Sequence, residues 1–280
     1  MSIRQVAVPP SGTALRLHHI LSRNSLIVAA ALLLLAGLAW AWLWSMPGSG
    51  QAMSGADMTA MEGMEMGGMV MPPSPWSATY LSMAFLMWAV MMVAMMVPSA
   101  APMILLHARI DRSESEGARL RNSALFILSY LLVWSGFAAL AAGAQALLLD
   151  RGWLSSAALA LGQRSLAAAL LALAAFYELT PAKGQCLDHC QAPLLFIHRH
   201  WQAGAAGAFR LGLRHGLYCL GCCWALMLLL FVGGVMNLAW VALLTILVTA
   251  QKAAPVRWQA HRWFAALLLL SAMILLLRPA

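Results

Sequence analysis

The chain has 280 residues, of which 62% are hydrophobic and only 9% are charged, and its formal net charge is +8. This composition excludes an ordinary soluble globular protein. A positive charge suggests nucleic acid binding in a soluble protein. Here, however, the Lys and Arg residues lie in short stretches beside apolar runs, which indicates membrane topology and no nucleic-acid partner.

Long apolar runs predict an all-α fold, a polytopic membrane helix bundle of about seven transmembrane helices in a lipid bilayer. A polar leader, residues 1–24, precedes the first helix at 25–46, whose Trp-rich end is typical of a membrane interface. A cleaved signal peptide is the alternative, but the run is too long and lacks a small-x-small site. We expect the later spans at 78–106, 123–149, a fourth that ends near Pro181, 211–232, 236–250 and 263–277.

The distribution of basic residues predicts the orientation. Residues 47–77 form a Met-rich loop after the first helix, and residues 78–277 form a six-helix metal-binding membrane domain that contains a Cys-bearing segment at 183–214. Fourteen Lys and Arg residues fall on the side of the leader and three on the other side. We therefore expect the N-terminus and segment 183–214 in the cytosol, and the Met-rich loop and the C-terminus outside.

Fifteen of the 19 methionines lie between Met46 and Met103. In the Met-rich loop, Met-x-x-Met and Met-x-Met spacings recur, so several thioethers can surround one ion without regular secondary structure. Thioether sulfur is a soft donor that selects Cu(I), and it persists in an oxidising compartment. The alternative is a low-complexity linker. The predicted ligands in this loop are Met58, Met61, Met64 and Met66.

The second predicted helix carries methionines near its middle, at helical spacings that place them on shared faces. These are Met91, Met92, Met95 and Met96. Pro98 removes the hydrogen bond to the carbonyl of Ala94 and is expected to kink the helix at this depth. The alternative is that these methionines only pack against other helices or lipid.

Two groups of cysteines complete the set of soft donors. Cys219, Cys222 and Cys223 lie within the fifth predicted span, at a depth similar to that of the methionines. Thiolates bind Cu(I) and Zn(II) once they are deprotonated, although buried cysteines also serve as small hydrophobic residues. Cys186 and Cys190 lie on the reducing side, and share one face if their segment is helical.

Glu178 lies about one turn inside the predicted interface, and a buried carboxylate there requires a partner. The sequence offers Lys183, His215 and Lys252 at the same level. Such a group more often stabilises helix packing than moves protons.

Separated sequence blocks carry a resemblance to a known family. They are Trp88-Ala-Val-Met-Met-Val-Ala-Met-Met-Val-Pro98 with Pro102-Met103, Tyr177-Glu-Leu-Thr-Pro-Ala-Lys183 with Cys186, Cys190 and Pro193, Gly216-x-x-Cys219-x-Gly221-Cys222-Cys223-Trp224 with Met227, and Gly234-x-Met236-Asn237-x-x-Trp240. Over residues 76–252 the chain resembles the bacterial predicted metal-binding integral membrane proteins grouped as domain of unknown function 2182. The resemblance implies metal binding in a bacterial inner (plasma) membrane, without a settled activity. The family often has Glu before the final Lys, where this chain has Gln251, and its pattern does not include the Met-rich loop.

We therefore predict an integral membrane protein that handles Cu(I), with silver or zinc as alternative ions. External methionines capture the ion, the methionines of the second helix and Cys219, Cys222 and Cys223 pass it on, and the cysteines of segment 183–214 receive it. Affinity then rises along the path from neutral thioethers to thiolates.

Two other functions stay open. One is a non-transporting assembly factor that delivers copper to a metalloenzyme, with a copper chaperone or copper enzyme as its partner. The other is a thiol redox protein that works through Cys219-x-x-Cys222. The sequence contains no motif typical of hydrolytic or nucleotide chemistry, so we do not expect an enzyme of either class. A homo-oligomer is compatible with every one of these functions.

Overall fold

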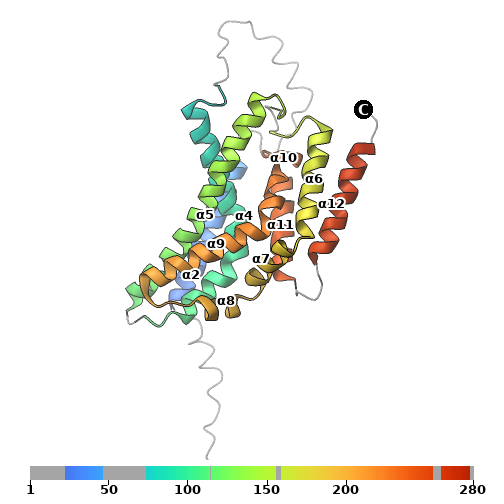
Figure 1. Cartoon of the computed structure of the whole chain (residues 1–280). Helices are drawn as coiled ribbons and strands as arrows, with labels where there is room; N and C mark the ends of the chain where they lie inside the picture. The colour runs from blue at the N-terminus through green and yellow to red at the C-terminus, as the bar shows by residue number, and fades with distance from the viewer. Residues whose placement is uncertain (1–22, 47–73, 114, 156–158, 255–259, 278–280) are drawn as a thin grey trace, which may run out of the picture.

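The computed structural model describes residues 23–46, 74–113, 115–155, 159–254 and 260–277. Within these ranges the fold is helical, and the only β-type pairing is an isolated bridge between Leu154 and Leu161 (Figure 1). The all-α prediction is therefore confirmed. In chain order the helices are α2 (Arg23–Ser45), α4 (Ala78–Ile110), α5 (Glu116–Asp150), α6 (Arg164–Glu178), α7 (Pro181–Gln191), α8 (Pro193–His200), α9 (Gly204–Leu228), α10 (Leu230–Gly233), α11 (Leu238–Ala253) and α12 (Ala260–Leu277).

In this described part, four segments are long and apolar enough to cross a membrane: α2, α4, α5, and α9 continued by α10. The pair α6 and α7, bent by 67° at its break, makes a fifth if the two helices form one broken span. α11 and α12 are shorter apolar helices. The expected number of seven spans and the orientation of the termini therefore stay predictions.

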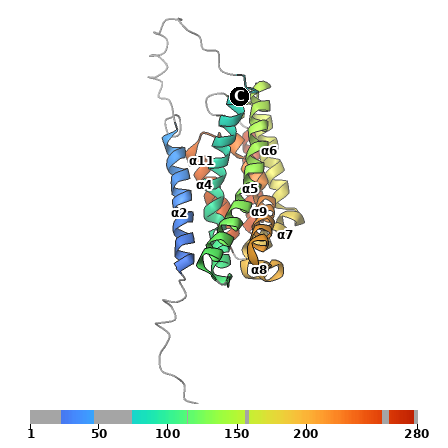
Figure 2. The ribbon, with the colours of Figure 1, turned by 90° about the vertical axis from the view of Figure 1, so that its left-hand side faces the viewer.

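α4 is central to the bundle. α2 and α5 pack along it, and α8 and α11 also contact it (Figures 1 and 2). α9 packs mainly against α5, and α12 packs against α6. Glycine allows α9 to approach α5 closely, because a Cβ atom at Gly212 would lie 2.2 Å from Ser129 Oγ and one at Gly216 would lie 2.9 Å from Val133 Cγ2.

Several helices extend beyond the predicted spans into polar sequence. α5 begins at Glu116 instead of near Ser123, and the hydroxyl of Ser115 accepts a hydrogen bond from the amide of Ala118 at its start. α9 begins at Gly204 instead of near Leu211. The expected segment 183–214 thus consists of α7, α8 and the first turns of α9. Hydropathy marks only the apolar part of a helix, whereas backbone hydrogen bonding continues into its polar flanks.

Pro98 opens the hydrogen-bond ladder of α4 as the sequence predicted, since proline has no amide hydrogen to donate to Ala94. α2 supplies the replacement donor: the indole Nε1 of Trp40 donates to the carbonyl of Ala94 at 3.1 Å. From α5, the hydroxyl of Tyr130 donates to the carbonyl of Met96 at 3.2 Å. Neighbouring helices therefore stabilise the opened part of α4 at the depth of its methionines.

Candidate metal centre

The cysteines of α9 face the interior. Cys219, Cys222 and Cys223 are each no more than 1% exposed. The thiols of Cys222 and Cys223 donate to the carbonyl of Cys219, at 3.1 Å and 2.9 Å. Residues three and four positions apart share a helix face, so one turn of α9 presents several sulfur atoms in one direction.

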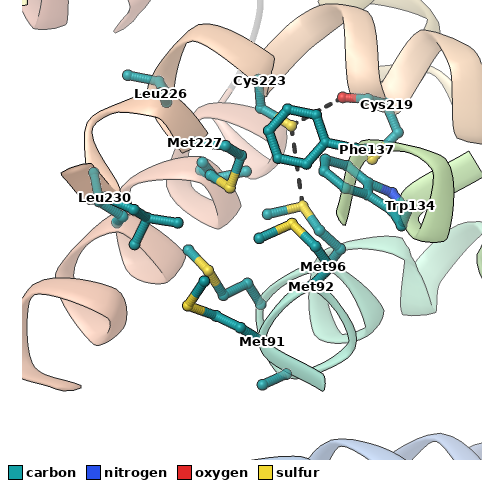
Figure 3. Packing of buried hydrophobic residues seen from close by; sticks show 14 of the residues in the cluster. Met91, Met92, Met96, Trp134, Phe137, Cys219, Cys223, Leu226, Met227 and Leu230 are labelled. Atoms are coloured by element: carbon teal, nitrogen blue, oxygen red, sulfur yellow. Dashed lines mark hydrogen bonds between the residues drawn. The ribbon is translucent and has the colours of Figure 1, made fainter. Parts of the chain in front are cut away.

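α4 brings its methionines to the same place. Met91, Met92, Met95 and Met96 are all at most 1% exposed. Met96 Sδ lies 4.0 Å from Cys223 Sγ (Figure 3). The expected convergence of the second predicted span with the cysteine-bearing helix is confirmed by this contact. Met227, one turn after Cys223 on α9, is fully buried in the same hydrophobic cluster (Figure 3).

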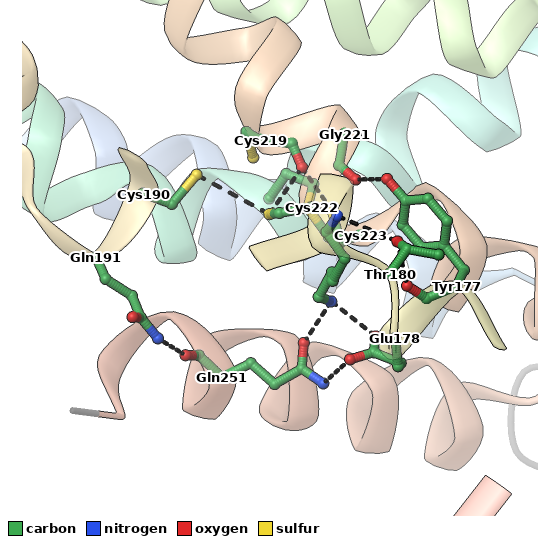
Figure 4. A network of polar contacts seen from close by, with 12 residues as sticks. Tyr177, Glu178, Thr180, Cys190, Gln191, Cys219, Gly221, Cys222, Cys223 and Gln251 are labelled. Atoms are coloured by element: carbon green, nitrogen blue, oxygen red, sulfur yellow. Dashed lines mark hydrogen bonds and ion pairs between the residues drawn. The ribbon is translucent and has the colours of Figure 1, made fainter. Parts of the chain in front are cut away.

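α7 adds two more thiols. Cys190 Sγ lies 3.9 Å from Cys222 Sγ (Figure 4), and Cys186 packs against Gly221, where a Cβ would lie 2.7 Å from its sulfur. From the sequence, we expected Cys186 and Cys190 to receive the ion at a position separate from the methionines of α4 and the cysteines of α9. In the structure α7 is helical and packs against α9, so the two groups of cysteines lie next to each other. We call Met96, Cys190, Cys219, Cys222 and Cys223 the sulfur cluster.

A buried ion pair holds α7 in this position. Lys183 Nζ lies 2.7 Å from Glu178 Oε1, and both side chains are fully buried. Gln251 of α11 accepts from Lys183 at 2.8 Å and donates to Glu178 at 3.2 Å (Figure 4). Of the partners expected for Glu178, the structure thus selects Lys183. Thr180 caps α7 at the bend by accepting a hydrogen bond from the amide of Lys183.

A cation lies beside the sulfur cluster. Lys252 Nζ is 3.0 Å from Cys219 Sγ and 2.8 Å from Ser99 Oγ. The hydroxyl oxygen of Tyr130 lies 3.1 Å from the same sulfur. An ammonium group at this distance stabilises negative charge on sulfur.

Among the described residues, no three His, Cys, Asp or Glu side chains converge closely enough to hold a metal ion. A closed structural zinc site, which needs four such ligands, therefore does not fit this geometry. Cu(I) accepts fewer donors and binds both thiolate and thioether sulfur. The contacts from Cys190 to Cys222 and from Cys223 to Met96 supply donors of both kinds.

The predicted ligands now divide by position. Met91, Met92, Met95 and Met96 and the five cysteines lie on α4, α7 and α9 as described, whereas Met58, Met61, Met64 and Met66 lie outside the described residues. Metal binding by all of them stays a prediction.

Sequence reasoning missed three residues at the site. Tyr130 drew no attention. Lys252 was considered only as a partner for Glu178, because a lysine at the end of an apolar helix usually extends to the membrane interface. Met227 was noted only within a family block, although its four-residue spacing from Cys223 indicates a shared face.

His215 stacks on Tyr130 with ring centroids 5.6 Å apart, and within the described chain neither of its ring nitrogens has a hydrogen-bond partner.

The model of the PpoB2 family, described as copper chaperone, matches residues 85–275, a range that contains the whole sulfur cluster and Lys252. Comparison with curated proteins and with solved structures gives no match.

Proposed function

The chain belongs to the PpoB2 family of copper chaperones, and from this premise we propose that it is an integral membrane copper chaperone that holds Cu(I) in the sulfur cluster and releases it to an acceptor. The observation that carries the proposal is the convergence of thiol and thioether sulfur from three helices at one buried place, with Cys190 3.9 Å from Cys222 and Met96 4.0 Å from Cys223. The predicted resemblance to domain of unknown function 2182 is compatible with this role.

The chemistry of loading follows from the ligands. Thiols must lose their protons to bind a metal, so Cu(I) held between two cysteines releases two protons and leaves a complex with one negative charge. The ammonium group of Lys252, 3.0 Å from Cys219 Sγ, offsets this charge inside an apolar bundle. Thioethers bind without a proton change, so Met96 can contact an arriving or departing ion while a thiol is still protonated.

Handover requires that the site can open. α7 is a short helix that follows a 67° bend, and it contributes Cys186 and Cys190. Its movement away from α9 would separate Cys190 from Cys222 and lower the affinity of the sulfur cluster for Cu(I). An acceptor that offers its own thiolates or thioethers can then take the ion by ligand exchange, and the copper stays Cu(I) throughout.

Competition with a chromogenic Cu(I) chelator tests the proposal. The full chain in detergent, kept reduced, is expected to withdraw Cu(I) from the chelator. Cys190→Ser and Cys222→Ser are expected to weaken binding by at least about tenfold. Met273→Leu, at an exposed position of α12, is the matched control and should bind as the wild type does. Equal affinity in all four proteins would refute the role of the sulfur cluster.

Inward transport is the second candidate, because the methionines of α4 extend from the end of the molecule near Met83 to the sulfur cluster. Flux into vesicles separates the two functions. A chaperone binds Cu(I) and gives it to an acceptor without net uptake, whereas a transporter accumulates copper in the vesicle and loses this activity in Cys222→Ser.

A further inference from the structure

A pocket of about 490 Å³ lies at the end of the molecule where α2 ends and α4 begins, and none of the residues of the sulfur cluster lines it. Residues from several elements line it: the end of α2, the first turns of α4, the last turns of α5 and the turn between α10 and α11. Four of the lining residues are methionines, namely Met46, Met83, Met87 and Met236. We call this the methionine pocket.

The lining of the methionine pocket contains no Asp, Glu, His, Cys, Lys or Arg. Its main polar groups bond to one another, since the amide nitrogen of Gln145 donates to the hydroxyl of Tyr80 at 2.6 Å. The amide oxygen of Gln145 accepts from the indole of Trp88 at 2.8 Å. Thioether sulfur is therefore the main donor the pocket offers to a cation, and hard cations such as Mg²⁺ or Ca²⁺ find no carboxylate there.

The position of the pocket relates it to both methionine-rich parts of the chain. Met46 and Pro75, which line it, lie just before and just after residues 47–73 in the sequence; the seven methionines of that segment lie outside the described residues. Met87 lies on the inner side of the pocket, only 6% exposed. Met91 follows one helical turn later, about 6 Å further along α4. Met96 then contacts Cys223. Soft donors thus succeed one another from the pocket to the sulfur cluster.

We propose that the methionine pocket is a second, thioether-only Cu(I) site, which receives the ion before it reaches the sulfur cluster. This inference rests on the proposed function, because it assigns an entry point to the same cargo. Neutral thioethers bind Cu(I) more weakly than thiolates do, so an ion in the pocket moves readily to the cluster. The ligands lose no proton, and binding in the pocket is therefore independent of pH between mildly acidic and neutral conditions, unlike binding at the cysteines.

Methyl NMR of the full chain tests the inference, with Ag(I) as a redox-inert probe. The chain is labelled with ¹³C at the methionine methyl groups and purified in detergent, and single Met→Leu variants assign the signals. The signals of Met46, Met83, Met87 and Met236 are expected to shift together and to saturate at one Ag(I) concentration, also in the Cys222→Ser variant. Met273, at an exposed position of α12, is the control, and the chemical shift of its methyl signal should not change when Ag(I) is added. The double variant Met83→Leu/Met236→Leu should weaken Ag(I) binding to the remaining pocket methionines by at least about tenfold.

The outcomes separate this inference from the proposed function. If the Met96 signal shifts with Ag(I) while the four pocket signals stay, the pocket is not a metal site and the chaperone role stands. If neither group shifts, both proposals fail. If the pocket signals shift only when the detergent or lipid is changed, an acyl chain occupies the pocket and the inference is overturned. It is also overturned if the Ag(I) affinity of the pocket falls on acidification in parallel with that of the cysteines.

Discussion

At the scale of single residues, charge is what distinguishes this cluster from ordinary sulfur packing. Buried cysteines and methionines often only fill space in a helix bundle. Lys252 gives no such packing benefit, and placing its ammonium group among apolar helices is costly unless an anion is near. Its contact with Cys219 Sγ at 3.0 Å supports our proposal that sulfur carries negative charge here when Cu(I) is bound.

Removal of this charge should weaken copper binding. In Lys252→Gln the amide can still donate to Ser99, but no cation offsets the charge of a Cu(I)–thiolate complex. We expect the Cu(I) affinity to fall by about tenfold, a change in binding free energy of about 1.4 kcal/mol, as measured by chelator competition. Lys252→Arg keeps the charge and should retain most of the affinity. If Lys252→Gln binds Cu(I) as tightly as the wild type, the charge has no part in holding the ion.

The buried pair of Glu178 and Lys183 should matter for stability. Lys183→Met leaves a carboxylate without its cation in a fully buried place, and we expect a loss of about 3–5 kcal/mol. The double variant Glu178→Leu/Lys183→Met removes both charges and should recover much of that loss. Thermal unfolding in detergent measures the difference. Arg199→Met, on an exposed face of α8, is the control and should change stability by less than about 0.5 kcal/mol. A double variant less stable than Lys183→Met would contradict this account.

At the scale of elements, the site depends on a helix whose hydrogen bonds are completed by its neighbours. Pro98 leaves the carbonyl of Ala94 without its usual partner in α4, and Trp40 of α2 donates to that carbonyl at 3.1 Å. α2 therefore does more than add apolar surface. It stabilises the part of α4 that carries Met91 to Met96, although the family match begins only at residue 85.

A double-mutant cycle tests this coupling. Trp40→Phe removes the donor and should destabilise the protein by about 1 kcal/mol. In the Pro98→Ala background the amide of residue 98 can bond to Ala94, so the same Trp40→Phe change should cost close to nothing. Chemical unfolding of the four proteins in detergent gives the coupling energy, and Trp263→Phe, at an exposed position of α12, controls for loss of the indole. Equal costs in both backgrounds would show that the contact is incidental.

At the scale of the whole molecule, the features that the sequence predicted depend on local signals. Apolar run length predicted the helical fold, and helical spacing predicted that the methionines of α4 share faces and that the cysteines of α9 do so too. The structure shows that these faces point inward. The approach of Cys190 to Cys222 was beyond such reasoning, because it depends on the bend before α7 and on the buried pair of Glu178 and Lys183. The methionine pocket could not be predicted from the sequence either, because its lining residues come from separate elements.

The molecule also has two chemically different ends. One end, where α4 ends, α5 and α9 begin and α8 lies, gathers basic residues, whereas the methionine pocket lies at the other (Figure 1). Arg109, Arg112, Arg119, Arg121, Arg199, Arg210 and Arg214 belong to the basic end. Basic residues beside membrane spans stay in the cytosol, so this polarity favours a pocket that opens to the outside.

Reporter fusions to the full chain test this orientation. Alkaline phosphatase, which folds only in an oxidising compartment, is expected to be active when fused to the C-terminus and inactive when inserted between α4 and α5. Green fluorescent protein at the same positions should give the reverse pattern, and expression levels serve as the control. An active phosphatase between α4 and α5 would place the basic end outside. The methionine pocket would then face the cytosol, where thiols compete strongly for Cu(I), and it could not serve as the point of capture.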